Sequence, residues 1–375
     1  MSKILFISNI AKRVGSFSIA SISAAKECGF DFIYAANWNA ASSEQRQEDE
    51  KRFGIKLAHI DLVRAPYSIH NIRAYRQIIE LIKNENIEYI HCNTPTGGLL
   101  GRLAGQKCKV KEVIYQVHGF HFYNGAPIHS WMIYYPIERW LSKKTDALIT
   151  INKEDYERAK DFRLRNNGKV YYVPGVGMEL EQYVVSEQTR KKKRKELGLE
   201  LGDVALISMG DLIKRKNYSV AIEAVANAHN KRLQYYICGQ GPEERALKRL
   251  SAKLGISDQV HFLGYRTDVK DLLMAADIFL FTSMQEGLSR SLMEAMASGL
   301  PCIVSNIRGN VDLITDGKGG KLCNSIESYT QAITSISNSE SLRKQMSDYN
   351  IEAIKLFDIS ASQEKMVEIY RNVFR

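Results

Sequence analysis

Two glutamates, Glu286 and Glu294, lie eight residues apart in a stretch that reads as strand, turn and helix. The apolar positions after Gly287 recur at helical spacing, so Glu286 should lie in the turn and Glu294 about a turn and a half inside the helix. At about 1.5 Å rise per residue, the two carboxylates would stand roughly 10–12 Å apart. Glycosidase carboxylate pairs are roughly 5–9.5 Å apart. The spacing therefore disfavours a hydrolase and favours contacts at two ends of one extended ligand.

The turn between these glutamates offers a place for a phosphate. The backbone amides of Gly287, Leu288 and Ser289 come just before the positive end of the predicted helix, where anions bind favourably. The alternative is that Glu286 is an ordinary loop acid and Glu294 an ordinary surface residue of the helix.

A basic loop is the second candidate phosphate site. Gly210 follows a predicted strand, and Lys214, Arg215 and Lys216 come just before the next helix. Their charges, together with helix amides, could hold a diphosphate. The alternative is a solvated basic loop.

The first half of the chain places other polar residues after strands. His118 ends one predicted strand, Asn93 and Thr94 end another, and Gly15 with Ser16 starts a helix. We expect His118 to bind a sugar or phosphate, or else to be a satisfied structural residue, whereas His121 should pack. The other positions could equally be ordinary strand-to-helix turns.

Several motifs of other enzyme classes are missing from the sequence. Gly239 and Gly241 allow close backbone approach to a ligand, but they lack the full G-x-G-x-x-G spacing of a dinucleotide site. There is no G-x-x-x-x-G-K-[ST] motif and no Asp-x-Asp, the carboxylate pair with which many nucleotide-sugar enzymes hold a divalent metal. We therefore expect no cofactor and no metal.

Composition and charge bound the remaining possibilities. The 375 residues are 45% apolar, enough for two or three domains, and the net charge of +10 suits nucleic acid, an anionic membrane or a polyanionic small molecule. No nucleic-acid-binding module is recognisable, and the basic run 190–195 reads as a solvated face at the start of a helix. The six cysteines form no metal-binding or disulfide pattern, and residues 1–8 read as a strand, so we expect a cytoplasmic protein.

Strand-like and helix-like segments alternate along the chain, which predicts two α/β domains with doubly wound parallel sheets. The first should span residues 1–180 and the second 181–355, with a helix at 356–375 that packs back on the first. Ligands of such sheets bind beyond the carboxyl ends of the strands. We therefore expect a binding site in the cleft between the domains.

Together these features resemble the retaining GT-B glycosyltransferases of glycosyltransferase family four. The resemblance covers essentially the whole chain and is nearest to the bacterial members that build capsular polysaccharides and exopolysaccharides. Its further matches, in order, are Ile90–Gly98, His118–Tyr123, Tyr135–Glu138, Ile151–Tyr156 and Arg308–Asn310. The fold it implies is GT-B, two Rossmann-like domains facing across a cleft, with the acceptor on the N-terminal domain and the nucleotide-sugar on the C-terminal one.

The resemblance also implies roles for the donor site. Glu286 would contact the donor sugar, Glu294 the ribose hydroxyls, and Lys216 with the amides of residues 287–289 the diphosphate. The backbone near Tyr265 and Arg266 would lie by the base. We place Gly210 and Gly239 in the same donor site.

In the first domain, the family pattern implies that His118 is a catalytic residue that contacts the sugar or supports the leaving phosphate. Gly15 and Ser16 match the first-domain loop loosely, and we place Asn93 and Thr94 beside them. The chain departs from the family at Asp211, where an arginine is common, and Arg215 is the candidate substitute.

The sequence thus predicts a metal-independent retaining transferase. It would move a hexose or N-acetylhexosamine from a UDP-sugar to a polyprenyl-diphosphate-linked glycan for capsule, exopolysaccharide or O-antigen synthesis, and the positive charge suggests peripheral association with the inner face of the membrane. The alternatives are a nucleotide-sugar epimerase of the same architecture and a basic nucleic-acid-binding protein.

Overall fold

The computed structural model describes residues 1–175, 177–184 and 186–374. The chain divides into two compact units, the first formed by Met1–Met178 with Phe357–Arg375 and the second by Glu179–Leu356. The predicted boundaries at 180 and 355 lie within two residues of these limits. The chain therefore enters the second unit once and returns to the first for its last helix.

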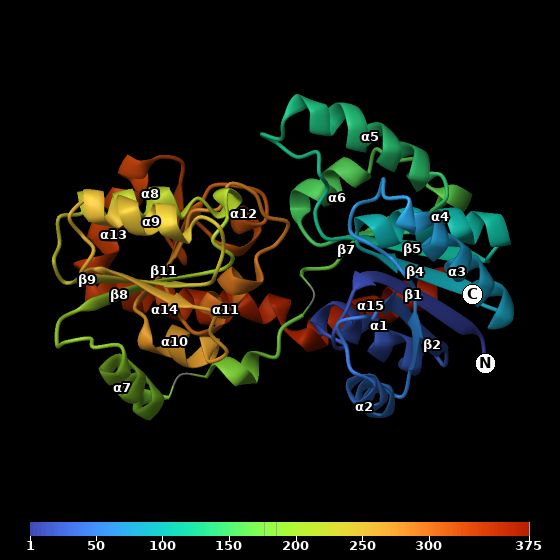
Figure 1. Ribbon diagram of the computed structural model, residues 1–375, viewed down its shortest axis with the longest axis horizontal. Coiled ribbons are helices and arrows are strands. Elements are labelled where there is room, and N and C mark those ends of the chain that lie inside the picture. Colours follow the sequence, from blue (N-terminus) through green and yellow to red (C-terminus); the bar gives the residue numbers. More distant parts are fainter. Residues whose placement is uncertain (176, 185, 375) are drawn as a thin grey trace. The chain divides into compact units, whose positions relative to one another are not determined.

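Within the described residues, the first unit contains a seven-stranded sheet whose strands run parallel, in the order β3-β2-β1-β4-β5-β6-β7 (Figure 1). Its strands are β1 (Lys3–Ile10), β2 (Asp31–Asn37), β3 (Lys56–His59), β4 (Tyr89–Asn93), β5 (Glu112–Val117), β6 (Ala147–Thr150) and β7 (Lys169–Tyr172). The central strands are almost wholly buried, as expected of a parallel sheet covered on both faces.

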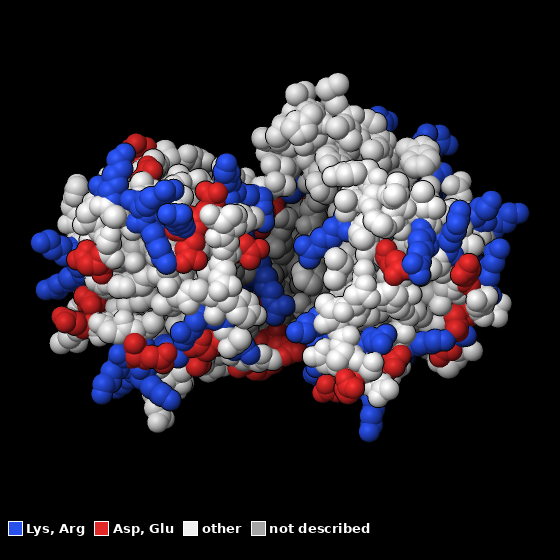
Figure 2. Space-filling view, in the orientation of Figure 1, with Lys and Arg blue, Asp and Glu red and all other residues white. Residues whose placement is uncertain are grey.

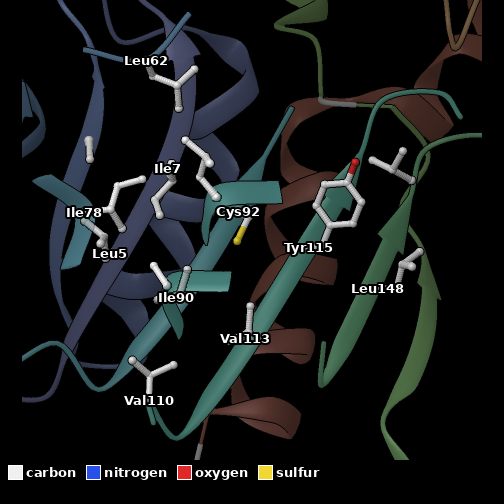
Figure 3. Packing of buried hydrophobic residues seen from close by; sticks show 14 of the residues in the cluster. Leu5, Ile7, Leu62, Ile78, Ile90, Cys92, Val110, Val113, Tyr115 and Leu148 are labelled. Carbon is white, nitrogen blue, oxygen red and sulfur yellow. The ribbon is translucent and has the colours of Figure 1, made fainter. Parts of the chain in front are cut away.

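Helices cover both faces of this sheet: α1 (Ser16–Glu27), α2 (Ser43–Phe53), α3 (His70–Asn84), α4 (Pro95–Cys108), α5 (Ile128–Ser142), α6 (Lys153–Ala159) and α15 (Ile359–Val373). On one face Ile90, Cys92 and Tyr115 pack with residues of α3 and α4 (Figure 3). On the other face Phe6 and Tyr34 pack with α1 and the C-terminal helix α15. The C-terminal helix is therefore part of the core of the first unit.

Within the part of the chain that the structure describes, the second unit contains a six-stranded parallel sheet in the order β10-β9-β8-β11-β12-β13. The strands are β8 (Val204–Met209), β9 (Leu233–Cys238), β10 (Val260–Gly264), β11 (Ile278–Phe281), β12 (Cys302–Ser305) and β13 (Gly320–Cys323). The helices are α7 (Glu187–Glu196), α8 (Tyr218–Asn227), α9 (Glu244–Lys253), α10 (Val269–Ala275), α11 (Arg290–Ala297), α12 (Asn310–Leu313), α13 (Ile326–Ser337) and α14 (Glu340–Ala353). The predicted doubly wound α/β class is confirmed in both units.

The strand orders also locate the ligand positions. In each sheet the chain order reverses between two neighbouring strands, β1 and β4 in the first unit and β8 and β11 in the second. Doubly wound sheets bind ligands beyond the carboxyl ends of the strands at such a switch point. At the carboxyl ends of these four strands lie Ser16 at the start of α1, Asn93 at the end of β4, and Lys216 and Glu286 in the segments that follow β8 and β11.

The structure corrects the interpretation of the basic run 190–195. The run begins at the fourth residue of α7 and continues to the residue before its end, so it does not lie at the start of the helix. Arg190 and Arg194 both pair with Asp277, and the nearly buried Lys193 pairs with Asp268 at 2.8 Å. One side of the run is therefore a structural ion-pair network that fastens α7 to α10 and β11, and only the other side is solvated.

Among the residues described here, no helix combines the length and the apolar character that crossing a membrane requires.

Candidate active site

Glu286 is the centre of a charged cluster in the second unit. Its Oε1 accepts hydrogen bonds from Lys216 Nζ at 2.8 Å, Ser283 Oγ at 2.7 Å and Arg215 Nη1 at 3.1 Å. Lys216 comes from the loop after β8 and Glu286 from the loop after β11, so the cluster spans the switch point of the sheet. The structure thus brings together three residues that the sequence predicted for one site, whereas Lys214 is exposed.

The loop after β12 supports the Glu286 turn from behind. Arg308, which is 6% exposed, donates from Nε to the Glu286 carbonyl oxygen at 3.1 Å. Gly309 has a φ of +81°, and a Cβ there would lie 2.4 Å from the Gly287 carbonyl oxygen. Only glycine allows this close approach. The Arg308–Asn310 motif therefore fixes the turn that carries Glu286.

Glu294 lies inside α11, as predicted. Ser289 caps the helix, and its side chain accepts a hydrogen bond from the amide of Leu292. The Glu294 Oε1 atom accepts hydrogen bonds from Arg290 Nε at 2.9 Å and from the Tyr183 hydroxyl at 3.1 Å. Burial and, as a second cause, the Glu294 carboxylate raise the pKa of Tyr183 to about 12. The Tyr183 hydroxyl therefore stays protonated and donates a hydrogen bond to Glu294.

Loop packing explains why Gly239 and Gly241, after β9, are glycines. A Cβ at Gly239 would lie 1.9 Å from the Gly210 carbonyl oxygen, and one at Gly241 would lie 2.4 Å from the Leu212 carbonyl oxygen. These glycines let the loop after β9 pack on the loop after β8. The sequence predicted that these glycines approach a ligand, but in the structure they approach the loop after β8. Gly239 therefore acts on the site only indirectly, by packing on Gly210.

The residues predicted beside the base differ in their surroundings. The side chain of Tyr265 is 75% exposed. Arg266 pairs with Asp268 at 2.6 Å and with Glu196 at 3.3 Å, and its guanidinium holds the pKa of Asp268 far below its usual range. Arg266 is therefore fixed by carboxylates, and Tyr265 keeps an aromatic ring open to solvent.

In the first unit His118 and Asn93 end neighbouring strands with unpaired polar atoms. Both ring nitrogens of His118 and the Oδ1 atom of Asn93 are buried, and they make no hydrogen bond with any described residue. The His118 ring packs edge-on against Phe17, 5.0 Å away. Burial lowers the pKa of His118 to about 4, so its imidazole is neutral at pH 7. Buried polar atoms without partners are uncommon in folded proteins, so packing alone does not account for these three atoms.

The backbone at Thr94 is strained. Thr94 has a φ of +68°, which is an outlier for a β-branched residue, and it stands directly before α4. In the neighbouring strand β1, Asn9 Oδ1 accepts a hydrogen bond from the Gly97 amide of α4 at 3.2 Å. Strained residues cluster at functional sites because the surrounding structure must hold them. The strained backbone at Thr94 is therefore consistent with a functional role for this residue.

Gly15 precedes α1 in extended backbone, and a Cβ there would meet no atom within 4 Å. Ser16 begins the helix. The space in front of Gly15 is therefore open for a bound molecule. His121 stacks on Tyr134 at 4.5 Å between ring centres, so the prediction that it packs is confirmed.

His91 is a buried histidine of β4, and its ionisation makes the stability of the folded protein depend on pH. Its Nδ1 lies 2.8 Å from the Tyr370 hydroxyl of α15 and 3.4 Å from Ser21 Oγ. Burial, with His118 as a second cause, lowers the pKa of His91 to about 3. The folded state favours the neutral form of His91. The resulting contribution to the free energy of unfolding is complete above the ordinary histidine pKa near 6.5 and is lost as the pH falls towards 3.

We expect the stability difference between wild type and His91→Gln to shrink by roughly 2 kcal/mol between pH 7 and pH 5, because glutamine keeps hydrogen-bonding capacity but does not titrate. Urea unfolding of both proteins at the two pH values measures it. A stability difference that does not change with pH would contradict the assignment.

Sequence reasoning missed Ser283, Tyr183, Arg290 and Arg308 as site residues. Ser283 and Arg290 lie inside the predicted strand–turn–helix stretch, and Arg290 stands four residues before Glu294, a spacing at which helical side chains pair. Tyr183 lies in the short helix η2 (Leu180–Tyr183), far away along the sequence, and gave no signal. Among residues 1–175, 177–184 and 186–374, no group of three or more His, Cys, Asp and Glu side chains could hold a metal ion.

Comparison with known proteins finds a glycosyltransferase family model on each unit. The family model described as glycosyl transferases group 1 matches residues 189–353, and the model described as glycosyl transferase 4-like matches residues 16–152. The Bacillus subtilis (strain 168) protein named as the glycosyltransferase EpsD is 32% identical over 375 residues, covering 98% of this chain and 96% of its own. The Escherichia coli UDP-Gal:alpha-D-GlcNAc-diphosphoundecaprenol alpha-1,3-galactosyltransferase is 27% identical over 309 residues, with 80% of each chain covered.

Solved structures share the fold. The crystal structure of Anabaena Alr3699/HepE in complex with UDP and glucose superposes with a TM-score of 0.79 at 18% identity and covers 100% of both chains. WaaG, a glycosyltransferase involved in lipopolysaccharide biosynthesis, gives a TM-score of 0.73 at 18% identity over 98% of this chain and 99% of its own. Together with the whole-length relative and the two family models, these matches show that the chain belongs to the GT-B glycosyltransferases of the group 1 and 4-like families.

Proposed function

We propose that this glycosyltransferase moves a hexose or N-acetylhexosamine from a UDP-sugar to a polyprenyl-diphosphate-linked glycan during synthesis of a capsule, exopolysaccharide or O-antigen. The observation that carries the proposal is the cluster of Glu286, Lys216 and Arg215 at the switch point of the second sheet. The names of two relatives support the acceptor class. One is the galactosyltransferase already described, and the other is a Campylobacter jejuni N,N'-diacetylbacillosaminyl-diphospho-undecaprenol alpha-1,3-N-acetylgalactosaminyltransferase.

The second unit would bind the donor. Cleavage of the bond between the anomeric carbon and the diphosphate oxygen leaves negative charge on the diphosphate and positive charge on the sugar. Lys216, Arg215 and the amides of residues 287–289 would stabilise the diphosphate, and Glu286 would face the sugar. Glu286 pairs with both of these cations. The donor diphosphate would thus replace a carboxylate as their partner.

Glu294 and Tyr183 would bind the nucleoside end. A carboxylate accepts hydrogen bonds from both ribose hydroxyls, and Arg290 and Tyr183 hold Glu294 in place for this contact. The exposed ring of Tyr265 would lie beside the base. Gly210 and Gly239 would keep the phosphate loop in position, because their close packing leaves no room for a side chain between the loops.

The first unit would bind the acceptor at the carboxyl edge of its sheet. The neutral imidazole of His118 would contact the sugar or support the leaving phosphate, and Asn93, Thr94, Gly15 and Ser16 would line the acceptor side. We propose that transfer retains the anomeric configuration and needs no metal ion, and that the enzyme works in the cytoplasm against the inner face of the membrane.

The decisive experiment incubates the protein with labelled UDP- and GDP-sugars, with and without a polyprenyl-diphosphate sugar, in excess EDTA. We expect label in the lipid fraction only with a UDP-sugar and the acceptor together, and we expect the new linkage to keep the donor's anomeric configuration. Epimerised sugar without acceptor would indicate an epimerase. RNA binding without nucleotide-sugar binding would indicate a nucleic-acid-binding protein. Transfer abolished by EDTA and restored by a divalent ion would contradict metal independence.

Glu294→Ala should raise the KM for the UDP-sugar by roughly tenfold or more with kcat changed less than about threefold, because it removes a contact made equally in the ground and transition states. Tyr183→Phe, which only frees Glu294 from one hydrogen bond, should raise the KM by a smaller factor. Steady-state kinetics with varied donor measures both. A fall in kcat without a change in KM would contradict the assignment of Glu294 to the ribose.

A further inference from the structure

Four buried polar side chains form a row along one face of the first sheet. His91 and Asn93 belong to β4, Gln116 belongs to β5, and His118 directly follows β5. Asn93 and Gln116 are partners in the parallel register of the two strands. Because side chains alternate between the faces of a strand, the four lie opposite to Cys92, which packs with α4 (Figure 3). This polar row therefore lies between the sheet and the helices α1 and α15.

Tyr370 of the C-terminal helix α15 binds one end of the polar row. Its hydroxyl lies 2.8 Å from His91 Nδ1, and both side chains are fully buried. The two residues are 279 positions apart, and they meet because the chain returns to the first unit for its last helix. Burial raises the pKa of Tyr370, so the hydroxyl keeps its proton. The distance suits donation of that hydrogen to Nδ1.

Gln116 is the next member of the polar row. Its Oε1 atom and the Nε2 atom of His91 are both buried, and neither makes a hydrogen bond of good geometry with a described residue. The two side chains are nevertheless close, because hydrogen bonding with Gln116 opposes the effect of burial, the main cause of the low pKa of His91. Since Oε1 can only accept, a small side-chain adjustment joins the two atoms if His91 carries its proton on Nε2. In that tautomer Nδ1 is free to accept from Tyr370.

His118 lies at the ligand-binding end of the polar row. It stands two residues after Gln116 on the same face, and it is the second cause of the low pKa of His91, so the two rings are within electrostatic reach. Once the oxygen of Gln116 faces His91, its amide nitrogen has hydrogens to donate. One of the two buried, unpaired nitrogens of His118 can accept such a hydrogen. The other nitrogen then carries the proton of the neutral ring and presents an N–H donor to a ligand.

Neutral hydrogen bonds set the tautomers in the polar row. Lys, Arg, Asp and Glu are scattered over the surface visible in Figure 2, but among the described residues none of them is a cause of the pKa shift of either histidine. The position of the proton on a neutral imidazole depends on the partner of its other nitrogen. The Tyr370 hydroxyl is such a partner for His91, and the order of the remaining hydrogen bonds follows from it.

A purely structural role explains the polar row less well. Buried polar clusters that only stabilise a fold usually pair their atoms internally. Here a short hydrogen bond joins Tyr370 to His91, whereas unpaired atoms lie on Asn93, Gln116 and His118, at the carboxyl edge of the sheet. Ligands of doubly wound sheets bind at this edge. The distribution of paired and unpaired atoms thus suits a row that serves a binding site.

We propose that Tyr370 is a positioning residue, which acts through His91 and Gln116 to orient the imidazole of His118 and to fix which of its nitrogens carries the proton. The last helix of the chain, α15, would in this way direct the N–H group that His118 offers to its ligand. The effect on sugar transfer rests on the function proposed above, whereas the tautomer of His118 does not.

The first test reads the tautomers from the nitrogen chemical shifts of isotope-labelled histidine in the full chain, without any substrate. The variant His118→Gln identifies the signals of His118. We expect one tautomer for each ring in wild type, with the His91 proton on Nε2, and a mixture of tautomers for both rings in Tyr370→Phe. Unchanged His118 signals in Tyr370→Phe, or a His91 proton on Nδ1 in wild type, would overturn the proposal.

The second test measures sugar transfer and UDP binding. Tyr370→Phe keeps the ring and loses only the hydroxyl, so we expect kcat to fall by roughly tenfold and the affinity for UDP to stay within about twofold. The matched control is Tyr236→Phe in the second unit, which loses a buried hydroxyl that donates to the Leu197 carbonyl at 3.1 Å. It should keep the kcat and the histidine signals of wild type. The same kcat in Tyr370→Phe and wild type would refute the positioning role.

Gln116→Met is a second variant, which decides the question if Tyr370→Phe does not fold. Methionine resembles glutamine in size but has no amide, so it should lower kcat and change the His118 signals in the same way. Combining it with Tyr370→Phe should lower kcat no further than Gln116→Met alone, because members of one network are not additive. Losses that multiply would contradict the connection. If wild type transfers no sugar, the proposed function fails, and the histidine signals alone decide whether Tyr370 sets the tautomer of His118.

Discussion

Glu286→Gln should lower kcat by roughly 10²–10³-fold and change the affinity for UDP by less than about threefold. Glutamine has the same shape and can still bond to Ser283, so the loop should keep its structure. It cannot, however, balance positive charge that develops on the transferred sugar. Because the variant lacks the Glu286 carboxylate, Lys216 and Arg215 are free to bind the diphosphate, and the affinity for UDP should not fall.

The kinetics of sugar transfer at saturating acceptor measure the loss of kcat, and Glu327→Gln is the control. Glu327 is an exposed glutamate in the first turn of α13 in the same unit, and its replacement should leave the rate unchanged. A kcat of Glu286→Gln within about threefold of wild type would remove Glu286 from the catalytic machinery.

Lys216→Ala is expected to lower kcat/KM for the donor by about 10³-fold. Lys216 is mostly buried between Glu286, at 2.8 Å, and the Phe281 ring, at 4.7 Å, so its charge acts where water screens it little. Without it, the leaving diphosphate loses its nearest fixed cation, and Glu286 keeps only Arg215 as a cationic partner.

Lys216→Arg keeps the charge and serves as the matched variant. It should recover part of the lost kcat/KM, although its larger planar head fits the same space less well. If kcat/KM falls less than about tenfold in Lys216→Ala and more in Arg215→Ala, then Arg215 is the principal cation. Arg215 would then replace the arginine that the family commonly has at the position of Asp211.

The positions of Glu286 and Lys216 could be predicted because they depend on strand order. Each polar loop follows an apolar strand, and in parallel sheets the carboxyl ends of the strands meet at one edge. The spacing within α11 then placed Glu294 inside the helix and Glu286 before it. These inferences need only local patterns and the general rule for doubly wound sheets.

The partners that hold these residues could not be predicted in the same way. Tyr183 reaches Glu294 from 111 positions away, and Arg308 reaches the Glu286 carbonyl from another loop. Neither contact follows from periodicity, because each depends on how separate elements pack. The close packing of Gly239 on Gly210 also depends on how separate loops pack. The sequence predicted that Gly239 approaches a ligand, whereas in the structure it approaches a neighbouring loop.

Other elements, among them α2 and β13, could not be predicted for a different reason. Helix α2 buries only Asp49, so it has no apolar stripe, and its only signal was the capping box formed by Ser42 and Gln45. Strand β13 has four residues and begins with Gly320. Both owe their structure to neighbours: α2 to the bond between Asp49 and Arg13, and β13 to its pairing with β12.

Calorimetric titration of UDP into wild type, Glu286→Gln and Glu294→Ala tests most directly whether the two glutamates hold two ends of one donor. We expect Glu286→Gln to bind UDP within about threefold of wild type, and Glu294→Ala to bind it at least about tenfold more weakly, which corresponds to about 1.4 kcal/mol. Equal and mild losses in both variants would contradict the division of roles between Glu286 and Glu294.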